Sequence, residues 1–200
     1  MVAVGVLMII AALGLVVSNT VESRRAARYS AEALEKLKDV IPAEPSSLSG
    51  TPDNDDLFSD TEQAEETETI EIDGYTYCGY ISVEPLGIEL PVADSFSYAG
   101  LKRSPCRYSG AAGNNDLIIA AHNYSSHFGR LYELSSGEQI VFTSASGRKY
   151  RYKVVDVEVI DGGDTERMFS GASGEWDMTL FTCTLSGRSR VTVRAKLITE

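Results

Sequence analysis

Basic residues are few in this sequence, and their scarcity excludes one class of function. Lys and Arg together number 18 against 29 Asp and Glu, which gives a formal net charge of −11 and a pI of about 4.7. No basic stripe is visible, and from Asp39 to Leu101 there is no Lys or Arg at all. Because binding to a phosphate backbone needs such a stripe, we do not expect a nucleic-acid-binding protein.

Cysteine and histidine are also scarce, which argues against a structural metal site. The three cysteines, Cys78, Cys106 and Cys183, form no C-x-x-C pair, and the two histidines, His122 and His127, do not stand at zinc-finger spacing. We therefore expect neither a metal nor a cofactor. A disulfide between Cys78 and Cys106 is one alternative for these two thiols, and burial as small apolar side chains is the other.

One long apolar run is present, Val2–Val17, with sixteen residues that carry no charge. This is slightly short of the roughly 20 residues with which a helix crosses a bilayer. No A-x-A-like cleavage site follows the run, so we interpret residues 1–18 as an uncleaved membrane anchor, a buried core helix being the alternative. Arg24, Arg25 and Arg28 come next, and by the positive-inside rule they would keep the following domain in the cytoplasm.

Two further segments separate this anchor from the folded domain. In residues 19–41, small and apolar side chains recur every three or four positions, which is typical of an amphipathic helix, and Pro42 ends the pattern. Residues 42–68 are rich in Pro, Ser, Asp and Glu and cannot bury enough apolar surface to fold. We predict an acidic, flexible linker there, the alternative being a lid that mimics a substrate.

From residue 69 onward the pattern is that of short β-strands. β-Branched and aromatic residues are broken by Gly and Pro, and only two stretches, "HFGRLYEL" and "TERMFSGA", look like short helical turns. At least seven short strands in about 130 residues predict an all-β barrel or sandwich. We therefore place one folded domain at residues 69–200.

Three side chains with useful chemistry stand at strand ends. Cys183 closes an apolar strand, so its thiol is expected to be at least partly exposed, and exposure is a condition for reactivity. His122 closes another apolar strand and can exchange a proton near neutral pH. Arg190 lies seven residues after Cys183, past a turn, so in an antiparallel hairpin the two reach the same end of the sheet. A guanidinium fixed there offers donors to a carbonyl or an oxyanion.

Each of these assignments has an alternative. Taken singly, Cys183 could be a core cysteine, His122 a packing or solvent-facing histidine, and Arg190 an exposed charge at a strand end. His127 competes with His122, although no strand end fixes its position in the loop. Arg188 lies in the turn, and Arg194 lies farther along the strand on the same face as Arg190.

Together these residues resemble the signature of the sortase family. "TLFTC" (Thr179–Cys183) with an arginine seven residues later is similar to the family's TLxTC-and-Arg signature, and the histidine that ends "LIIAAH" is similar to its catalytic histidine. "YCGYISVEPLGIELPV" resembles the family's opening strands. The resemblance covers roughly Tyr75–Ile198. It implies an all-β fold, an eight-stranded β-barrel with short helical turns, preceded by an N-terminal helix.

The resemblance also implies an activity, that of a cysteine transpeptidase of Gram-positive cell surfaces. Such an enzyme cleaves an LPxTG-like sorting signal between Thr and Gly. Cys183 would attack the Thr carbonyl to form a thioester, and His122 would protonate the leaving amine and later take a proton from the incoming one. Arg190 would stabilise the oxyanion, and Thr182 would contribute to substrate binding.

The partners and location implied by the resemblance follow from that activity. They are surface proteins that bear a C-terminal sorting signal, and an amine acceptor from the cell wall or a pilin. The chain would be a single-pass protein of the cell membrane with its catalytic domain outside the cell, against the charge pattern described above.

The sequence departs from the family pattern in ways that bear on its subclass. "AAHNY" stands where Gly-His is more usual, and "HNYSSHFGRLYEL" resembles class B-like sortases without room for their long helix. No Asp-Pro-aromatic lid motif occurs, so a class B-like or class D-like enzyme is favoured over a pilin-polymerising one. Two other functions stay open: a thiol peptidase or hydrolase of the same fold, and a catalytically silent surface domain that binds peptide.

Overall fold

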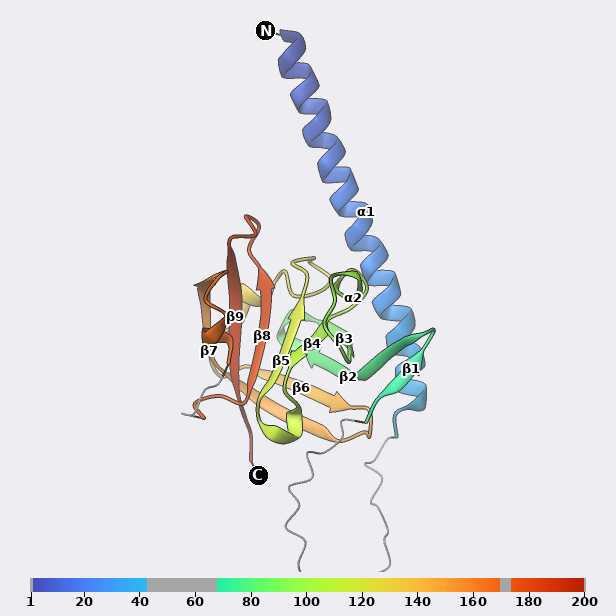
Figure 1. The fold of residues 1–200 in the computed structure, drawn as a ribbon, viewed down its shortest axis with the longest axis vertical. Coiled ribbons are helices and arrows are strands. Elements are labelled where there is room, and N and C mark those ends of the chain that lie inside the picture. Colours follow the sequence, from blue (N-terminus) through green and yellow to red (C-terminus); the bar gives the residue numbers. More distant parts are fainter. Residues whose placement is uncertain (1, 43–67, 170–173, 200) are drawn as a thin grey trace, which may run out of the picture.

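The computed structural model describes residues 2–42, 68–169 and 174–199, and it consists of a long helix beside a closed β-barrel (Figure 1). The helix α1 (Val2–Val40) is a single element of 39 residues. It runs without interruption through both segments expected at residues 1–18 and 19–41. Of the expected linker at 42–68, residues 43–67 lie outside the described part of the chain.

The barrel domain is built from short strands with a few helical turns between them. The strands are β1 (Ile70–Ile72), β2 (Tyr75–Val83), β3 (Ile88–Ala93), β4 (Cys106–Ser109), β5 (Leu117–Ala121), β6 (Gln139–Ser144), β7 (Lys149–Asp161), β8 (Met178–Cys183) and β9 (Ser189–Leu197). The helical elements are α2 (Tyr98–Leu101), η1 (Glu84–Leu86), η2 (Ala112–Asn114), η3 (Leu131–Glu133) and η4 (Thr165–Met168). The last two fall in the stretches for which the sequence predicts helical turns.

The strand order closes the sheet on itself. The sheet runs β1-β2-β3-β4-β5-β8-β9-β7-β6, and β6 pairs back onto β2. Eight strands, β2 to β9, therefore form a barrel, which leaves no exposed sheet edge among them. β1 pairs only with β2, through a tight turn in which Asp73 and Gly74 both have positive φ. The predicted eight-stranded barrel is confirmed, with β1 as a ninth strand outside it.

Two clusters of buried side chains hold the fold together. One fills the barrel and includes Ile119, Leu180 and Val193 from three adjacent strands. The other lies outside the barrel wall and joins Ala33 and Leu37 of α1 to residues of the strands and of α2. Because strand residues alternate between the two faces, the apolar strands β5 and β8 serve both clusters at once.

The thiols of Cys78 and Cys106 belong to these two cores. Both are buried and free, so the alternative of small apolar side chains holds and the disulfide alternative does not. Burial raises the pKa of Cys78 to about 12. It raises the pKa of Cys106 to about 11. At neutral pH both thiols are therefore protonated and unreactive.

The C-terminal half of α1 is docked on the barrel by charge as well as by apolar contact. Lys36 lies 2.6 Å from Asp73, and Lys38 lies 2.5 Å from Glu89. The guanidinium of Arg103 stands over the ring of Tyr29 on α1 and over the ring of Tyr75 on β2, 4.3 and 4.1 Å from their centroids. These contacts join α1 firmly to the barrel.

The N-terminal half of α1 makes no such contacts. It projects away from the barrel (Figure 1), and its large apolar side chains are exposed. By length and composition this helix is able to cross a membrane, since its most apolar window has a mean hydropathy of 2.3 and none of that window is buried in the protein.

Candidate active site

Three adjacent strands bring the predicted site residues to one end of the barrel. β5 runs parallel to β8 with Ala121 opposite Thr182, so His122 and Cys183 follow at the same end of the two strands. β9 runs antiparallel to β8 with Arg190 directly opposite Cys183. The hairpin geometry expected from the sequence is therefore present, and the β5–β8 pairing adds the histidine to it.

The pleat of the strands aims Cys183 and Arg190 outward. Leu180 on β8 and Val193 on β9 fill the barrel interior. Since successive residues point to opposite faces, Cys183 and Arg190 lie on the outer face, and the thiol is half-exposed as the sequence suggests. A peptide approaching the barrel from outside can reach this thiol.

Thr182 points away from the outer face on which Cys183 lies, and it is buried. Its side chain is only 2% exposed. Its Oγ1 donates a hydrogen bond of 2.8 Å to the carbonyl oxygen of Ala121. This bond ties the ends of β8 and β5 together just before Cys183 and His122. The hydroxyl thus has a role in joining the two strands that carry the site.

His122 is half-buried and its imidazole is disposed to be neutral. Burial lowers the pKa of His122, the positive charge of Lys102 lowers it further, and the carboxylate of Glu22 opposes them. The ring of Tyr124 packs against it at a centroid distance of 5.0 Å. A neutral imidazole beside a half-exposed thiol can accept the thiol proton when a substrate arrives.

Arg190 is held between two strands and the turn before it. Its Nη1 donates hydrogen bonds to the carbonyl oxygens of Gly187 and Ser189, at 3.0 and 3.1 Å. On its other side β9 pairs with β7, where Gly162 follows the strand. A Cβ on Gly162 would come within 2.5 Å of the Arg188 carbonyl oxygen and 3.1 Å of Arg190 Nη1. Glycine is therefore required there for the turn and the guanidinium to fit.

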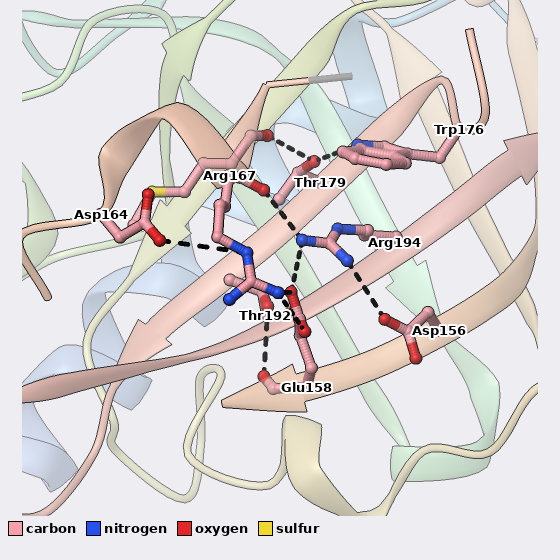
Figure 2. A network of polar contacts seen from close by, with 9 residues as sticks. Asp156, Glu158, Asp164, Arg167, Trp176, Thr179, Thr192 and Arg194 are labelled. Carbon is pink, nitrogen blue, oxygen red and sulfur yellow. Dashed lines mark hydrogen bonds and ion pairs between the residues drawn. The ribbon is translucent and has the colours of Figure 1, made fainter. Parts of the chain in front are cut away.

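The alternative arginine Arg194 is engaged in a network on the outside of β7 and β9 (Figure 2). It forms ion pairs with Asp156, at 3.2 Å, and with Glu158. Its guanidinium also stands over the ring of Trp176, 4.4 Å from the centroid.

The same network also includes Arg167 of η4, which follows β7, and Trp176, which precedes β8. Arg167 forms an ion pair with Glu158 at 2.8 Å, and the carbonyl of Arg167 accepts a hydrogen bond from Arg194 at 3.0 Å. Trp176 Nε1 donates to Thr179 Oγ1 at 2.9 Å. Arg194 is thus part of a structural cluster at the far end of β8, and Arg188 is exposed in the β8–β9 turn.

The competing histidine, His127, is completely buried beneath α1. The hydroxyl of Ser30 donates to the carbonyl of Arg103 at 2.6 Å, so it accepts from His127 Nε2 at 3.1 Å. Burial, followed by the neighbouring His122, lowers the pKa of His127 to about 4, with the Ala26 backbone opposing them. The sequence places this residue in an unanchored loop, but the structure anchors it to the helix.

Several neighbours of the site come from parts of the chain that sequence reasoning did not connect with it. Glu22 belongs to α1, and Lys102 follows α2, yet both act on His122. Tyr124 lies beside both histidines, 5.0 Å from the ring of His122 and 5.6 Å from that of His127. No local pattern could have found the first two, because their placement depends on how α1 packs on the barrel.

The described ranges contain no group of three or more His, Cys, Asp or Glu side chains that could hold a metal ion.

Comparison with known proteins gives one family match and a set of structural neighbours. The family described as "Sortase domain" matches residues 81–198. No curated protein matches. A sortase D5 transpeptidase from Clostridium perfringens is 24% identical with a TM-score of 0.55, over 62% of this chain and 79% of that one.

Two further neighbours belong to other sortase classes. Sortase A from Corynebacterium diphtheriae is 22% identical with a TM-score of 0.56, over 63% of this chain and 62% of that one. Sortase C from Clostridium perfringens, solved with the C-terminal cell wall sorting motif, is 20% identical with a TM-score of 0.53, over 62% and 71%. At these identities the neighbours show the fold alone, and they do not distinguish one sortase class from another.

Proposed function

Because this chain belongs to the sortase family, we propose that it is a cysteine transpeptidase that acts on an LPxTG-like sorting signal through Cys183. The observation that carries the proposal is the strand pairing. It sets Cys183 opposite Arg190 on β9 and next to the end of β5, from which His122 follows. A nucleophile, a proton carrier and an anion stabiliser thus share one end of the barrel.

In the first half of the reaction, Cys183 Sγ attacks the Thr carbonyl carbon of the signal. The thiol proton passes to the neutral imidazole of His122, which then donates it to the leaving Gly amine as the C–N bond breaks. The Arg190 guanidinium donates hydrogen bonds to the oxyanion that forms on the Thr carbonyl. The product is a thioester on Cys183 and a released amine.

In the second half, an incoming amine attacks the thioester carbonyl and gives a proton to His122. The thioester retains the energy of the cleaved amide, so the new amide forms without ATP and the thiol is regenerated. Thr182 acts in this scheme by holding the ends of β5 and β8 together, since its hydroxyl is bonded to the Ala121 carbonyl. Its contribution to substrate binding is therefore indirect.

An aromatic row beside Cys183 is suited to the apolar part of the signal. Phe181 precedes the cysteine by two residues on the same outer face, and Tyr108 packs edge-on against it at a centroid distance of 5.3 Å. Phe96 packs on Tyr108, also at 5.3 Å. We assign the apolar side chain of the sorting signal to this row, since aromatic rings combine a large apolar area with a defined geometry.

The proposed membrane anchor of the enzyme is the apolar half of α1. This half, within residues 1–18, is proposed as a single membrane anchor, residues 19–41 as the part of the helix docked on the barrel, and 42–68 as a linker to the catalytic domain at 69–200. On the family resemblance, and against the basic residues that follow the apolar run, we place the catalytic domain outside the cell, where surface proteins with sorting signals and amine acceptors of the cell wall or pili are found.

The experiment that tests this function uses the full chain in detergent micelles with internally quenched peptides that carry LPxTG-like motifs. Peptide is supplied alone, with an oligoglycine, or with a peptide that bears a diamino acid. A transpeptidase forms ligated product faster than hydrolysed product, and Cys183→Ala forms neither. Hydrolysis that no amine diverts would instead establish a thiol hydrolase. Peptide binding that persists in Cys183→Ala, without turnover in the parent chain, would establish a binding domain.

A further inference from the structure

The catalytic end of the barrel lies close to the point at which α1 leaves its apolar run. Glu22 follows Val17, the last residue of that run, by five positions, which is about 8 Å along a helix axis. The Glu22 carboxylate acts on His122. Burial raises the pKa of Tyr124, and the same carboxylate raises it further. Tyr124 is hydrogen-bonded to Glu22, and its ring lies 5.0 Å from that of His122, so His122 stands near the level of Glu22 along α1.

This level matters because the headgroup region of a bilayer is itself about 5–8 Å thick on each side. If the apolar half of α1 occupies the hydrocarbon, Glu22 and the His122 end of the barrel lie at the outer edge of the headgroups. The helix is continuous from Val2 to Val40 and is packed on the barrel, so the barrel keeps this height.

The β8–β9 turn is the part of the barrel that rises farthest toward the N-terminal half of α1 (Figure 1). At its tip Leu185 is 99% exposed, with Arg188 also exposed. On the side nearer α1, α2 carries Tyr98, which is 78% exposed. A large apolar side chain left in water at a turn tip contributes nothing to the fold, but at an interface it enters the apolar boundary.

The charges at this end differ from those of the protein as a whole. The chain has a net charge of −11. Yet beside the exposed carboxylate of Glu22, four basic side chains are exposed here: Arg24 and Arg25 in the α1 segment beyond the apolar run, Lys102 after α2, and Arg188 in the turn. Such side chains favour an anionic lipid surface, and exposed Tyr favours the headgroup level. The chemistry at this end of the barrel therefore matches that of a bilayer surface.

We propose that the β8–β9 turn and α2 rest on the same bilayer that holds α1, with Leu185 and Tyr98 in the interface and the basic side chains on anionic headgroups. The proposal rests on the membrane anchor of the proposed function. In this arrangement the thiol of Cys183, which ends β8 just before the turn, lies close to the membrane surface. The sorting signal of a substrate that is itself held in this bilayer would then meet the thiol without a search through solution.

Depth-dependent quenching tests this placement. The full chain with Leu185→Trp is reconstituted in vesicles of phosphatidylcholine and phosphatidylglycerol that contain brominated acyl chains. The native Trp176 precedes β8 at its opposite end and serves as an internal reference, about 20 Å from the turn for a strand of this length. Asn114→Trp, which is exposed in η2 at the far end of β5, is the matched control.

The expected result is that the emission added by Leu185→Trp is quenched at least about twofold more than that added by Asn114→Trp, while Trp176 is unaffected. Equal quenching at the two positions would overturn the proposal. Strong quenching of Leu185→Trp that persists without phosphatidylglycerol, together with quenching of Asn114→Trp, would also overturn it. Failure of the chain to float with the vesicles would refute the anchor and with it this inference.

A kinetic arm separates this inference from the proposed function. Leu185→Asp is expected to slow cleavage of a signal peptide held in the vesicle by an acyl chain several-fold, and to leave cleavage of the soluble peptide unchanged. Cys183→Ala loses both activities, which tests the chemistry alone. An equal loss on both substrates in Leu185→Asp would show that the turn acts on the site directly, and the membrane contact would be refuted while the transpeptidase would stand.

Discussion

Acid should loosen the contact between α1 and the barrel through one residue, His127. This side chain is completely buried against Ser30, and its pKa is lowered to about 4 from the ordinary 6.5, first by burial and then by the nearby His122. The unfolded chain binds a proton as the pH falls through 6.5, but the folded chain does not until about 4. Stability is therefore full above 6.5 and is lost as the pH falls between these values.

The size of this loss follows from the two pKa values. Each unit of difference is worth about 1.4 kcal/mol, so His127 alone removes about 2 kcal/mol of unfolding free energy between pH 7.5 and 5, and about 3 kcal/mol once the pH is below 4. A loss of about 2 kcal/mol is a large fraction of the 5–15 kcal/mol that typically stabilises a domain.

The matched variant is His127→Gln, whose amide can still donate to the Ser30 hydroxyl but does not titrate. Urea unfolding of the full chain in non-denaturing micelles, followed by the fluorescence of Trp176, gives the free energy at both pH values. The parent chain should lose about 2 kcal/mol more than the variant between pH 7.5 and 5, since the carboxylates are common to both. Equal losses would refute the buried, neutral state of His127.

Other substitutions test the remaining parts of the site and the fold. Arg190→Ala should lower kcat/KM by roughly 10² or more, as for loss of one oxyanion donor. Arg194→Ala should lower the melting temperature with a far smaller change in kcat/KM. The reverse order would show that the wrong arginine is assigned. Gly162→Ala should lower kcat, because its Cβ would displace the Arg188 carbonyl and crowd the Arg190 guanidinium, and unchanged kinetics would contradict that fit. Leu37→Ala should cost about 2–5 kcal/mol in urea unfolding because Leu37 is fully buried, and a neutral result would mean that α1 is not part of the folded unit.

The barrel and the hairpin that sets Cys183 opposite Arg190 could be predicted from the sequence because both depend on local patterns. β-Branched residues indicate short apolar strands. A cysteine and an arginine on the two sides of a tight turn come opposite each other when the strands pair as an antiparallel hairpin. The family resemblance then supplied His122 as the catalytic histidine, and the structure supplied the parallel pairing of β5 with β8 that brings the end of β5 beside Cys183. No spacing in the chain reveals that parallel pairing.

What the sequence did not show depends on contacts between distant segments. Ser30 meets His127 across 97 positions. Arg194 meets Asp156 across 38. A loop histidine and a strand arginine give no local sign that a helix and a loop will cover them. From the sequence, the arginines after the apolar run indicated only a membrane orientation. The structure places Arg24 and Arg25 on the exposed side of a helix that is docked on the barrel.

Intact-mass spectrometry of the full chain, mixed in micelles with sorting-signal peptides, tests the central claim most directly. A covalent acyl adduct on Cys183, absent in Cys183→Ala and relieved by an added amine with release of ligated peptide, is the result that a transpeptidase requires. Accumulation of the adduct should rise in the absence of amine. Turnover of the peptide with no adduct at Cys183, or an adduct on another residue, would contradict the assignment of this thiol as the nucleophile.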